Sequence, residues 1–126
     1  MKIAFVILLF FSLLALASNN PQSYSEAKKI WSQTKLKPEY QKYGIEFTQF
    51  NNYFHLDEKD ECYQLGSGPV NLMLVITHTD QDEFAIIEQV FSDIDNAKSQ
   101  CFKNSYRGVR TKIPPYLPFV LQLGMG

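Results

Sequence analysis

The first seventeen residues constrain this chain most, because they decide where it folds and how much of it remains to fold. After Lys2, the stretch Ile3–Leu16 is apolar apart from Ser12, and Ala15-Leu16-Ala17 supplies small residues at positions −3 and −1 of a cleavage site. This layout predicts an export signal, residues 1–17, that is cut off. An uncut membrane anchor is the alternative, but it needs about 20 apolar residues and this stretch is shorter. We expect a periplasmic or secreted protein.

Removal of those 17 residues from the 126-residue chain leaves 109, enough for one hydrophobic core. We expect a single α+β domain over residues 18–126, with a flexible leader at 18–24. The formal net charge of −1 becomes −2 without Lys2. Such a chain has no electrostatic basis for binding nucleic acid or an anionic membrane surface. We also expect no membrane insertion after the signal is removed.

The chain has two cysteines, Cys62 and Cys101. In an exported protein a lone pair is typical of one disulfide bond. Closing that loop would stabilise the fold by ~4 kcal/mol in the chain-entropy model. Two buried thiols are the alternative. A zinc or redox site is not predicted, because the cysteines lack C-x-x-C spacing.

Two helices are predicted before the middle of the chain. Ser23 and Glu26 form a capping-box pattern ahead of a helix at Ser25–Gln33. Pro38 suits the first turn of a second helix. Apolar residues recur along that helix at alternating gaps of four and three, which places them in one stripe: Leu36, Tyr40, Tyr43, Phe47, Phe50 and Phe54.

The second half of the chain reads as strand, strand, helix, strand. Val70–Thr77 is aliphatic and short, as in a central strand covered on both faces. Polar residues at 78–83 join it to a second strand at Phe84–Ser92, which predicts an antiparallel hairpin. A helix capped by Asp93 or Asp95 then ends at Gly108, and alternation predicts a third strand over residues 119–123.

The predicted fold is therefore an α+β domain. We expect a small antiparallel three-stranded sheet in the order strand, strand, helix, strand, with the two preceding helices packed on one face.

Two surfaces are candidates for binding. Tyr40, Tyr43 and Phe47 either pack across the sheet as core or line a groove for a peptide or a small apolar ligand. Arg107, Arg110 and Lys112 either are ordinary charge near a helix end or form a basic patch for an acidic partner.

The polar cluster at 78–83 contains Asp80, Asp82 and Glu83, which could hold a hard cation. The cluster lacks the glycine and distant Glu of an EF-hand, so a solvated hairpin tip is expected. The run from Asp57 to Glu61 is expected to be a solvated connector.

Catalysis would have to use one of two histidines. His55 with Asp57 could transfer a proton, and His78 could act as a general base. No nucleophile motif of the G-x-S-x-G kind accompanies them. We expect no catalytic residues, no metal and no cofactor; a small hydrolase would require a histidine beside a hydroxyl in a cleft.

Val70–Met125 resembles the C-terminal domain of TonB-type energy transducers in its strand, turn, strand, helix, strand order and in Ile113-Pro114-Pro115 before the last strand. The whole mature chain resembles small exported proteobacterial proteins of unknown function. Three patterns carry that resemblance: Cys101-Phe102, Tyr106-Arg107-Gly108-Val109 and the segment Pro114 to Phe119.

The TonB-type resemblance implies a periplasmic fold whose sheet edge pairs with a strand of a partner protein. The expected function is a non-enzymatic protein-interaction module. The alternative is a periplasmic small-ligand carrier or sensor that uses the aromatic-lined groove.

Overall fold

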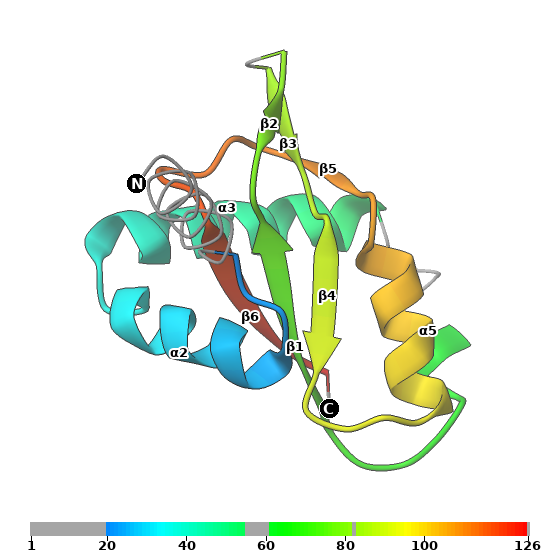
Figure 1. Ribbon diagram of the computed structural model, residues 1–126. Coiled ribbons are helices and arrows are strands. Elements are labelled where there is room, and N and C mark those ends of the chain that lie inside the picture. Colours follow the sequence, from blue (N-terminus) through cyan, green and yellow to red (C-terminus); the bar gives the residue numbers. More distant parts are fainter. Residues whose placement is uncertain (1–19, 55–60, 82, 126) are drawn as a thin grey trace, which may run out of the picture.

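The computed structural model describes residues 20–54, 61–81 and 83–125, and it is an α+β domain as the sequence predicts (Figure 1). The predicted signal, residues 1–17, lies outside the described residues. The elements in chain order are α2 (Tyr24–Thr34), α3 (Pro38–Phe54), β1 (Val70–Ile76), β2 (Thr79–Asp80), β3 (Phe84–Ile86), β4 (Gln89–Ser92), α5 (Ala97–Tyr106), β5 (Arg110–Thr111) and β6 (Phe119–Met125).

β1 is the middle strand of the central sheet, whose order is β4-β1-β6 with both pairs antiparallel. The pleat of the strand turns Leu72, Leu74 and Ile76 to one face and Met73 and Val75 to the other. All five side chains are buried. This strand is the one predicted from the aliphatic run at 70–77, and both of its faces need a cover.

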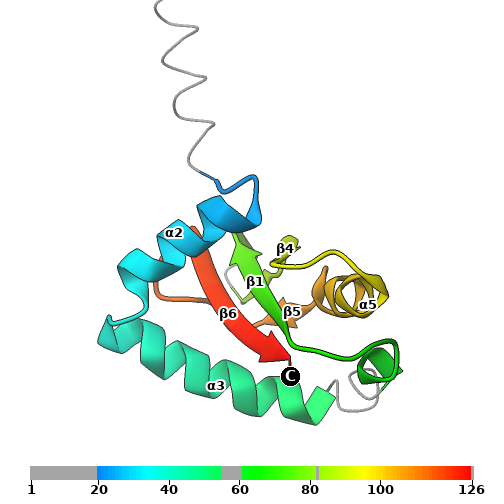
Figure 2. The ribbon, with the colours of Figure 1, turned by 90° about the horizontal axis from the view of Figure 1, so that it is seen from below.

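The helices provide that cover from both sides (Figure 2). α2 lies on the face of Met73 and Val75, where Ala27 is buried against them. α3 and α5 lie on the opposite face, together with the larger core cluster. The expectation that both leading helices share one face is therefore wrong. A short turn after α2 lets the chain pass around the β6 edge of the sheet, so α3 packs on the far side.

The larger cluster is rich in aromatic residues. Phe119 of β6 packs against Tyr43 with ring centroids 4.6 Å apart and against Tyr40 at 5.4 Å. Phe102 and Tyr106 of α5 are fully buried on the same face. The predicted stripe on α3 thus supplies core at Tyr43, while Leu36 precedes the helix and is exposed.

A second sheet with the order β2-β3-β5 extends from the first. The sequence predicts one strand at Phe84–Ser92, but the structure divides it into β3 and β4. Pairing explains the break. Ile87 N–H donates to Val109 O (3.0 Å) and Glu88 N–H donates to Val75 O (3.0 Å), so the chain changes partner between these residues. The third strand of this sheet, β5, was not predicted.

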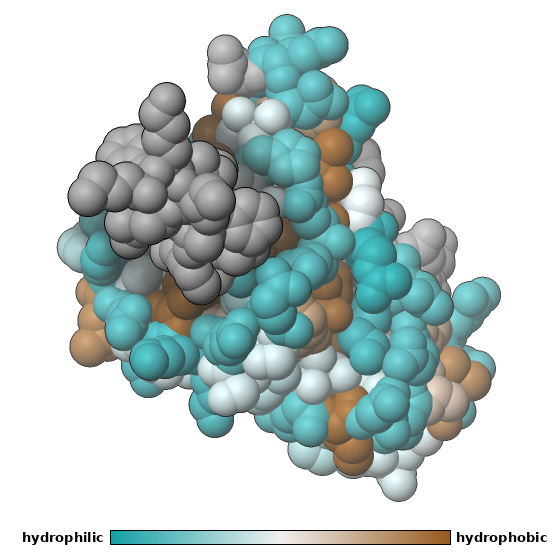
Figure 3. All heavy atoms as spheres, viewed as in Figure 1, coloured by the Kyte–Doolittle hydropathy of each residue, from teal (hydrophilic) through white to brown (hydrophobic). Residues whose placement is uncertain are grey.

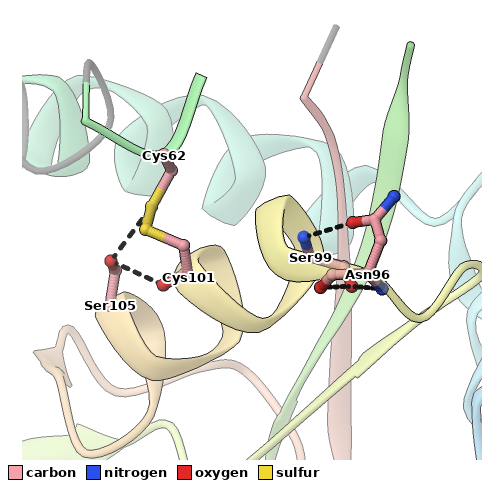
Figure 4. Close-up of a disulfide and its surroundings, with 5 residues drawn as sticks. All are labelled: Cys62, Asn96, Ser99, Cys101 and Ser105. Carbon is pink, nitrogen blue, oxygen red and sulfur yellow. Dashed lines mark hydrogen bonds between the residues drawn. A yellow bond between two sulfur atoms is a disulfide. The ribbon is translucent and has the colours of Figure 1, made fainter. Parts of the chain in front are cut away.

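The helix ends follow local sequence signals, with one correction. Ser23 caps α2 by accepting from Glu26 N–H (3.2 Å), as predicted. α5 is capped by Asn96 rather than by Asp93 or Asp95: its side chain accepts from Ser99 N–H, and Ser99 Oγ accepts from Asn96 N–H (both 2.8 Å; Figure 4). Gly108 follows α5 with φ of 84°, as its predicted role at the helix end requires.

Candidate binding surfaces

The outer edge of β6 carries backbone groups that no strand uses among residues 20–54, 61–81 and 83–125. Along a strand these groups point alternately to the two sides. Asp93 N–H donates to Asn71 O (3.1 Å), so the odd-numbered residues of β1 face β4. The even-numbered residues of β1 face β6, and they pair with the odd-numbered residues of β6. Gln122 and Gly124 therefore direct their N–H and C=O groups away from the sheet.

A groove of about 590 Å³ runs beside this edge, between β6 and α3. We call it the β6 groove. Ile45 of α3 lines this groove and is 63% exposed. The lining residues of the groove are Tyr40, Gln41, Gly44, Ile45, Thr48, Gln49, Leu121, Gln122 and Leu123.

Tyr40 partly closes the free edge. Its hydroxyl accepts hydrogen bonds from Trp31 Nε1–H (2.8 Å) and from the outward N–H of Gln122 (3.4 Å). Burial raises the pKa of Tyr40, while the hydrogen bonds from Gln122 and Trp31 act to lower it. The long bond to Gln122 is the weaker of the two by its length. The outward N–H of Gln122 is thus bound to a hydroxyl that a stronger acceptor could displace.

The other two residues of the expected aromatic groove lie deeper. Tyr43 and Phe47 are only 4% and 3% exposed and belong to the core. The Tyr43 hydroxyl donates to Lys112 O (2.7 Å) and lies 3.0 Å from Thr111 Oγ1, which joins α3 to β5. Burial raises the pKa of Tyr43 to about 12, although the hydrogen bond with Thr111 acts to lower it. Of the three residues, Tyr40 alone is among those that line the β6 groove.

A second cavity, of about 430 Å³, lies between α3, the β2–β3 hairpin and β5. We call it the β5 cavity. Two of the three expected basic residues meet there, Arg110 and Lys112, whereas Arg107 is the C-terminal cap of α5. Its described lining consists of Glu46, Phe47, Glu83, Phe84, Arg110, Thr111 and Lys112.

The histidine and acidic candidates lie mainly on the hairpin. His78 Nδ1 contacts Glu88 Oε1, and Thr77 Oγ1 donates to the other carboxylate oxygen of Glu88. Asp80 is the last residue of β2. His55, Asp57, Glu58, Asp60 and Asp82 lie outside the described residues. Within residues 20–54, 61–81 and 83–125, no three His, Cys, Asp or Glu side chains gather closely enough to bind a metal ion together.

The predicted disulfide is confirmed. Cys62 and Cys101 are bonded, with their Cα atoms 5.4 Å apart, and the bond ties the helical turn at residues 61–63 to α5 (Figure 4). Ser105 lies one turn further along α5, where its hydroxyl donates to Cys101 O (2.9 Å) and lies 3.7 Å from Cys62 Sγ.

The face drawn in Figure 3 is mainly hydrophilic. On the face drawn in Figure 3, polar residues cover much of the hairpin and α5, and hydrophobic residues form small separate patches. In the part of the chain that the structure describes, no helix is both long and apolar enough to span a bilayer.

The chain matches no protein-family model, no curated protein and no solved structure. Its function must therefore be argued from its own surfaces. Sequence reasoning singled out Tyr40 but not Ile45, Leu121 or Gln122, which complete the β6 groove. Gly44 in the middle of α3 was the available signal, since glycine inside a helix is costly and marks a place of close packing or open space.

Proposed function

We propose that this chain is an exported, non-enzymatic protein-interaction module that pairs an extended segment of a partner protein with the outer edge of β6. The export step is supported by the signal-like residues 1–17 and by the disulfide, because disulfides persist mainly outside the cytoplasm. The succession of strand, strand, helix and strand predicted for the C-terminal half resembles TonB-type C-terminal domains, and this resemblance supports a module that works through a sheet edge.

The observation that carries this proposal is the free edge of β6 beside an apolar groove. Edge strands are normally short, covered or charged, because open backbone groups attract other strands. Val120 is buried, but Gln122 is half-buried and Gly124 is exposed. An added strand can therefore pair with the backbone of these last two residues through up to four hydrogen bonds, each contributing about 1 kcal/mol.

The β6 groove adds side-chain recognition to this backbone pairing. Leu121 and Leu123 of β6 face α3. Side chains of an added strand alternate between the two faces of the sheet, so every second one enters the groove beside Ile45. The partner segment is therefore expected to be extended, with apolar residues at alternate positions. Its backbone carbonyl replaces the Tyr40 hydroxyl at Gln122 N–H.

A selection from phage-displayed random peptides tests the proposal. Peptides with alternating apolar residues are the expected outcome, and their dissociation constants are then measured against variants. Gln122→Pro removes an outward N–H, which an edge strand tolerates, and binding is expected to weaken tenfold or more. Ser92→Pro is the matched control, because its N–H also points outward but from β4 at the opposite edge, and it is expected to bind like the wild type.

Selection of no peptide, or equal binding by the two proline variants, would refute strand pairing at β6. Ile45→Glu tests the groove separately, since a carboxylate there opposes apolar side chains without altering the strand. It is expected to weaken binding, whereas Leu36→Glu, at an exposed residue that does not line the groove, is expected to leave it unchanged.

A further inference from the structure

The β5 cavity has the build of a small-ligand site and is separate from the β6 groove. Its volume of about 430 Å³ falls within the range of small-molecule pockets. Phe47 from α3 and Phe84 from β3 give it two aromatic walls, and Thr111 of β5 is buried between these elements. Figure 1 shows β5 passing between the hairpin and α3. An apolar group of modest size can thus lie against these two rings.

Charge in the cavity is distributed unequally between its two cations. Lys112 Nζ lies 2.8 Å from Glu46 Oε2, so each of these charges is already paired. Arg110 instead stacks over the ring of Phe84, with its guanidinium carbon 4.5 Å from the ring centroid. Among the described residues, no carboxylate lies within ion-pair distance of Arg110. Its N–H groups remain available beside an apolar wall.

A planar guanidinium held over an aromatic ring can bind a carboxylate through two parallel hydrogen bonds. We propose that the β5 cavity binds a small free acid: an apolar chain or ring lies against Phe47 and Phe84, and its carboxylate binds Arg110. This proposed site overlaps only in part with the aromatic groove predicted from the sequence, which consisted of Tyr40, Tyr43 and Phe47. Phe47 is shared, and Arg110 supplies the polar contact.

Titration calorimetry with octanoate, octanamide and octylammonium tests the chemistry. These probes share an apolar chain and differ in head group. Octanoate is expected to bind at least about tenfold more tightly than octanamide, because a hydrogen bond to a charged group is stronger than a neutral one. Octylammonium is expected not to bind measurably. Equal affinity for octanoate and octanamide would overturn the assignment of a carboxylate site.

Two variants with the same charge change locate the site. Arg110→Gln is expected to reduce octanoate affinity about tenfold and to remove the preference over octanamide. Arg107→Gln is the matched control, since Arg107 lies at the end of α5 and not among the lining residues. Equal losses in the two variants would show that the charge acts only at long range, and the proposal would fail.

Amide chemical shifts of the unmodified protein provide a readout that needs no variant. Octanoate is expected to shift the amides of Phe84, Thr111 and Lys112 and to leave those of Gln122 and Gly124 in place. Shifts confined to the β6 groove would contradict the proposed site. A peptide with an apolar C-terminal residue also presents a carboxylate next to an apolar side chain. N-acetyl-Ala-Ala-Leu is therefore titrated as well. If this peptide binds more tightly than octanoate, the proposal that the ligand is a small free acid is rejected.

Discussion

The central sheet has two outer strands, β4 and β6, which differ in length and in what lies beside their outer edges. β4 has four residues, and α5 lies beside it (Figures 1 and 2). β4 begins just after Glu88, where the chain passes from β3 of the second sheet into the central sheet. β6 has seven residues, and an apolar groove lies along the middle of its outer edge. Short length and a packed helix are recognised protections of an edge, and β4 has both.

The difference between the edges indicates where a partner strand can enter. β6 is closed at its start, where Val120 is buried, and within the described part of the chain the Tyr40 hydroxyl alone is hydrogen-bonded to the outward N–H of Gln122. Its backbone is open at Gly124. A long edge strand whose backbone groups are left open favours pairing with another strand.

The largest effect is expected from removing the bond that holds α5 in place beside β4. Replacement of both cysteines, Cys62→Ser with Cys101→Ser, is expected to lower the free energy of unfolding by ~4 kcal/mol, because the unfolded chain regains the entropy of an open loop. Denaturant titration measures this change. Amide exchange is expected to accelerate more in β4 than in β6, since α5 packs against β4.

Ser105→Ala is the control for that pair, because it removes a neighbouring hydroxyl and leaves the disulfide intact. Its expected cost is about 1 kcal/mol or less. A double-serine variant that loses no more stability than Ser105→Ala would contradict the role given to the disulfide.

Tyr43 fixes the wall of the β6 groove by tying α3 to β5, and its titration tests that contact. Its pKa is raised to about 12, so folding favours the protonated phenol. The raised pKa of Tyr43 therefore stabilises the folded state. Its full contribution to the free energy of unfolding is present below pH 10 and is lost as the pH rises through 12. The free energy of unfolding is expected to fall by about 2–3 kcal/mol over that window.

Tyr43→Phe should lose this part of the pH dependence, and it should also be destabilised near neutral pH by the loss of two hydrogen bonds. Denaturant titrations from pH 8 to 12 make the measurement. An unchanged alkaline profile in the variant would place the responsible group elsewhere.

Tyr40→Phe removes the hydroxyl that is hydrogen-bonded to Gln122 N–H at the β6 edge. The variant is expected to lose about 1 kcal/mol of stability, because Trp31 Nε1–H loses its acceptor. Its affinity for the selected peptides should nevertheless increase by a few-fold, since Gln122 N–H is then free. Weaker peptide binding would indicate that the hydroxyl recognises the partner instead of guarding the edge.

Gly44→Ala gives the smallest effect and has the opposite sign. Ala is favoured over Gly inside a helix by about 1 kcal/mol, and its Cβ would lie 3.7 Å from Leu121 Cδ1, an ordinary contact. The thermal midpoint is expected to rise slightly. Gly44→Leu tests the groove, because the larger side chain fills it and should block peptides; a variant that is stable and still binds would argue against the groove.

Much of the fold follows from local patterns. Ser23, Pro38 and Gly108 mark helix ends as expected, because capping depends on a few neighbouring residues. The aliphatic run at 70–77 becomes the middle strand. That run itself indicates a strand covered on both faces, and the structure satisfies this requirement by placing α2 opposite α3.

The features that were missed depend on distant contacts. Polar Glu88 and Gln89 interrupt the run Phe84–Ser92, but they do not predict a change of partner. That change depends on distant acceptors, Val109 O for Ile87 N–H and Val75 O for Glu88 N–H. β5 has only two residues, and it is a strand because it pairs with β3 next to the Ile87–Val109 hydrogen bond. The candidate sites were partly predictable. The helical stripe identifies Tyr40 of the β6 groove and Phe47 of the β5 cavity, but strand order decides that Gln122 lies on a free edge.

Amide hydrogen exchange in the presence of a selected peptide tests strand pairing at β6 most directly. The outward amides of Gln122 and Gly124 are expected to exchange more slowly when the peptide is bound, because each donates to a backbone carbonyl of the peptide, which at Gln122 replaces the long bond to Tyr40. Val90 and Ser92, which point outward from β4, serve as the internal comparison and are expected not to change. Slower exchange at Gln122 and Gly124 alone is the predicted result; unchanged exchange there, or protection at β4, would contradict the account.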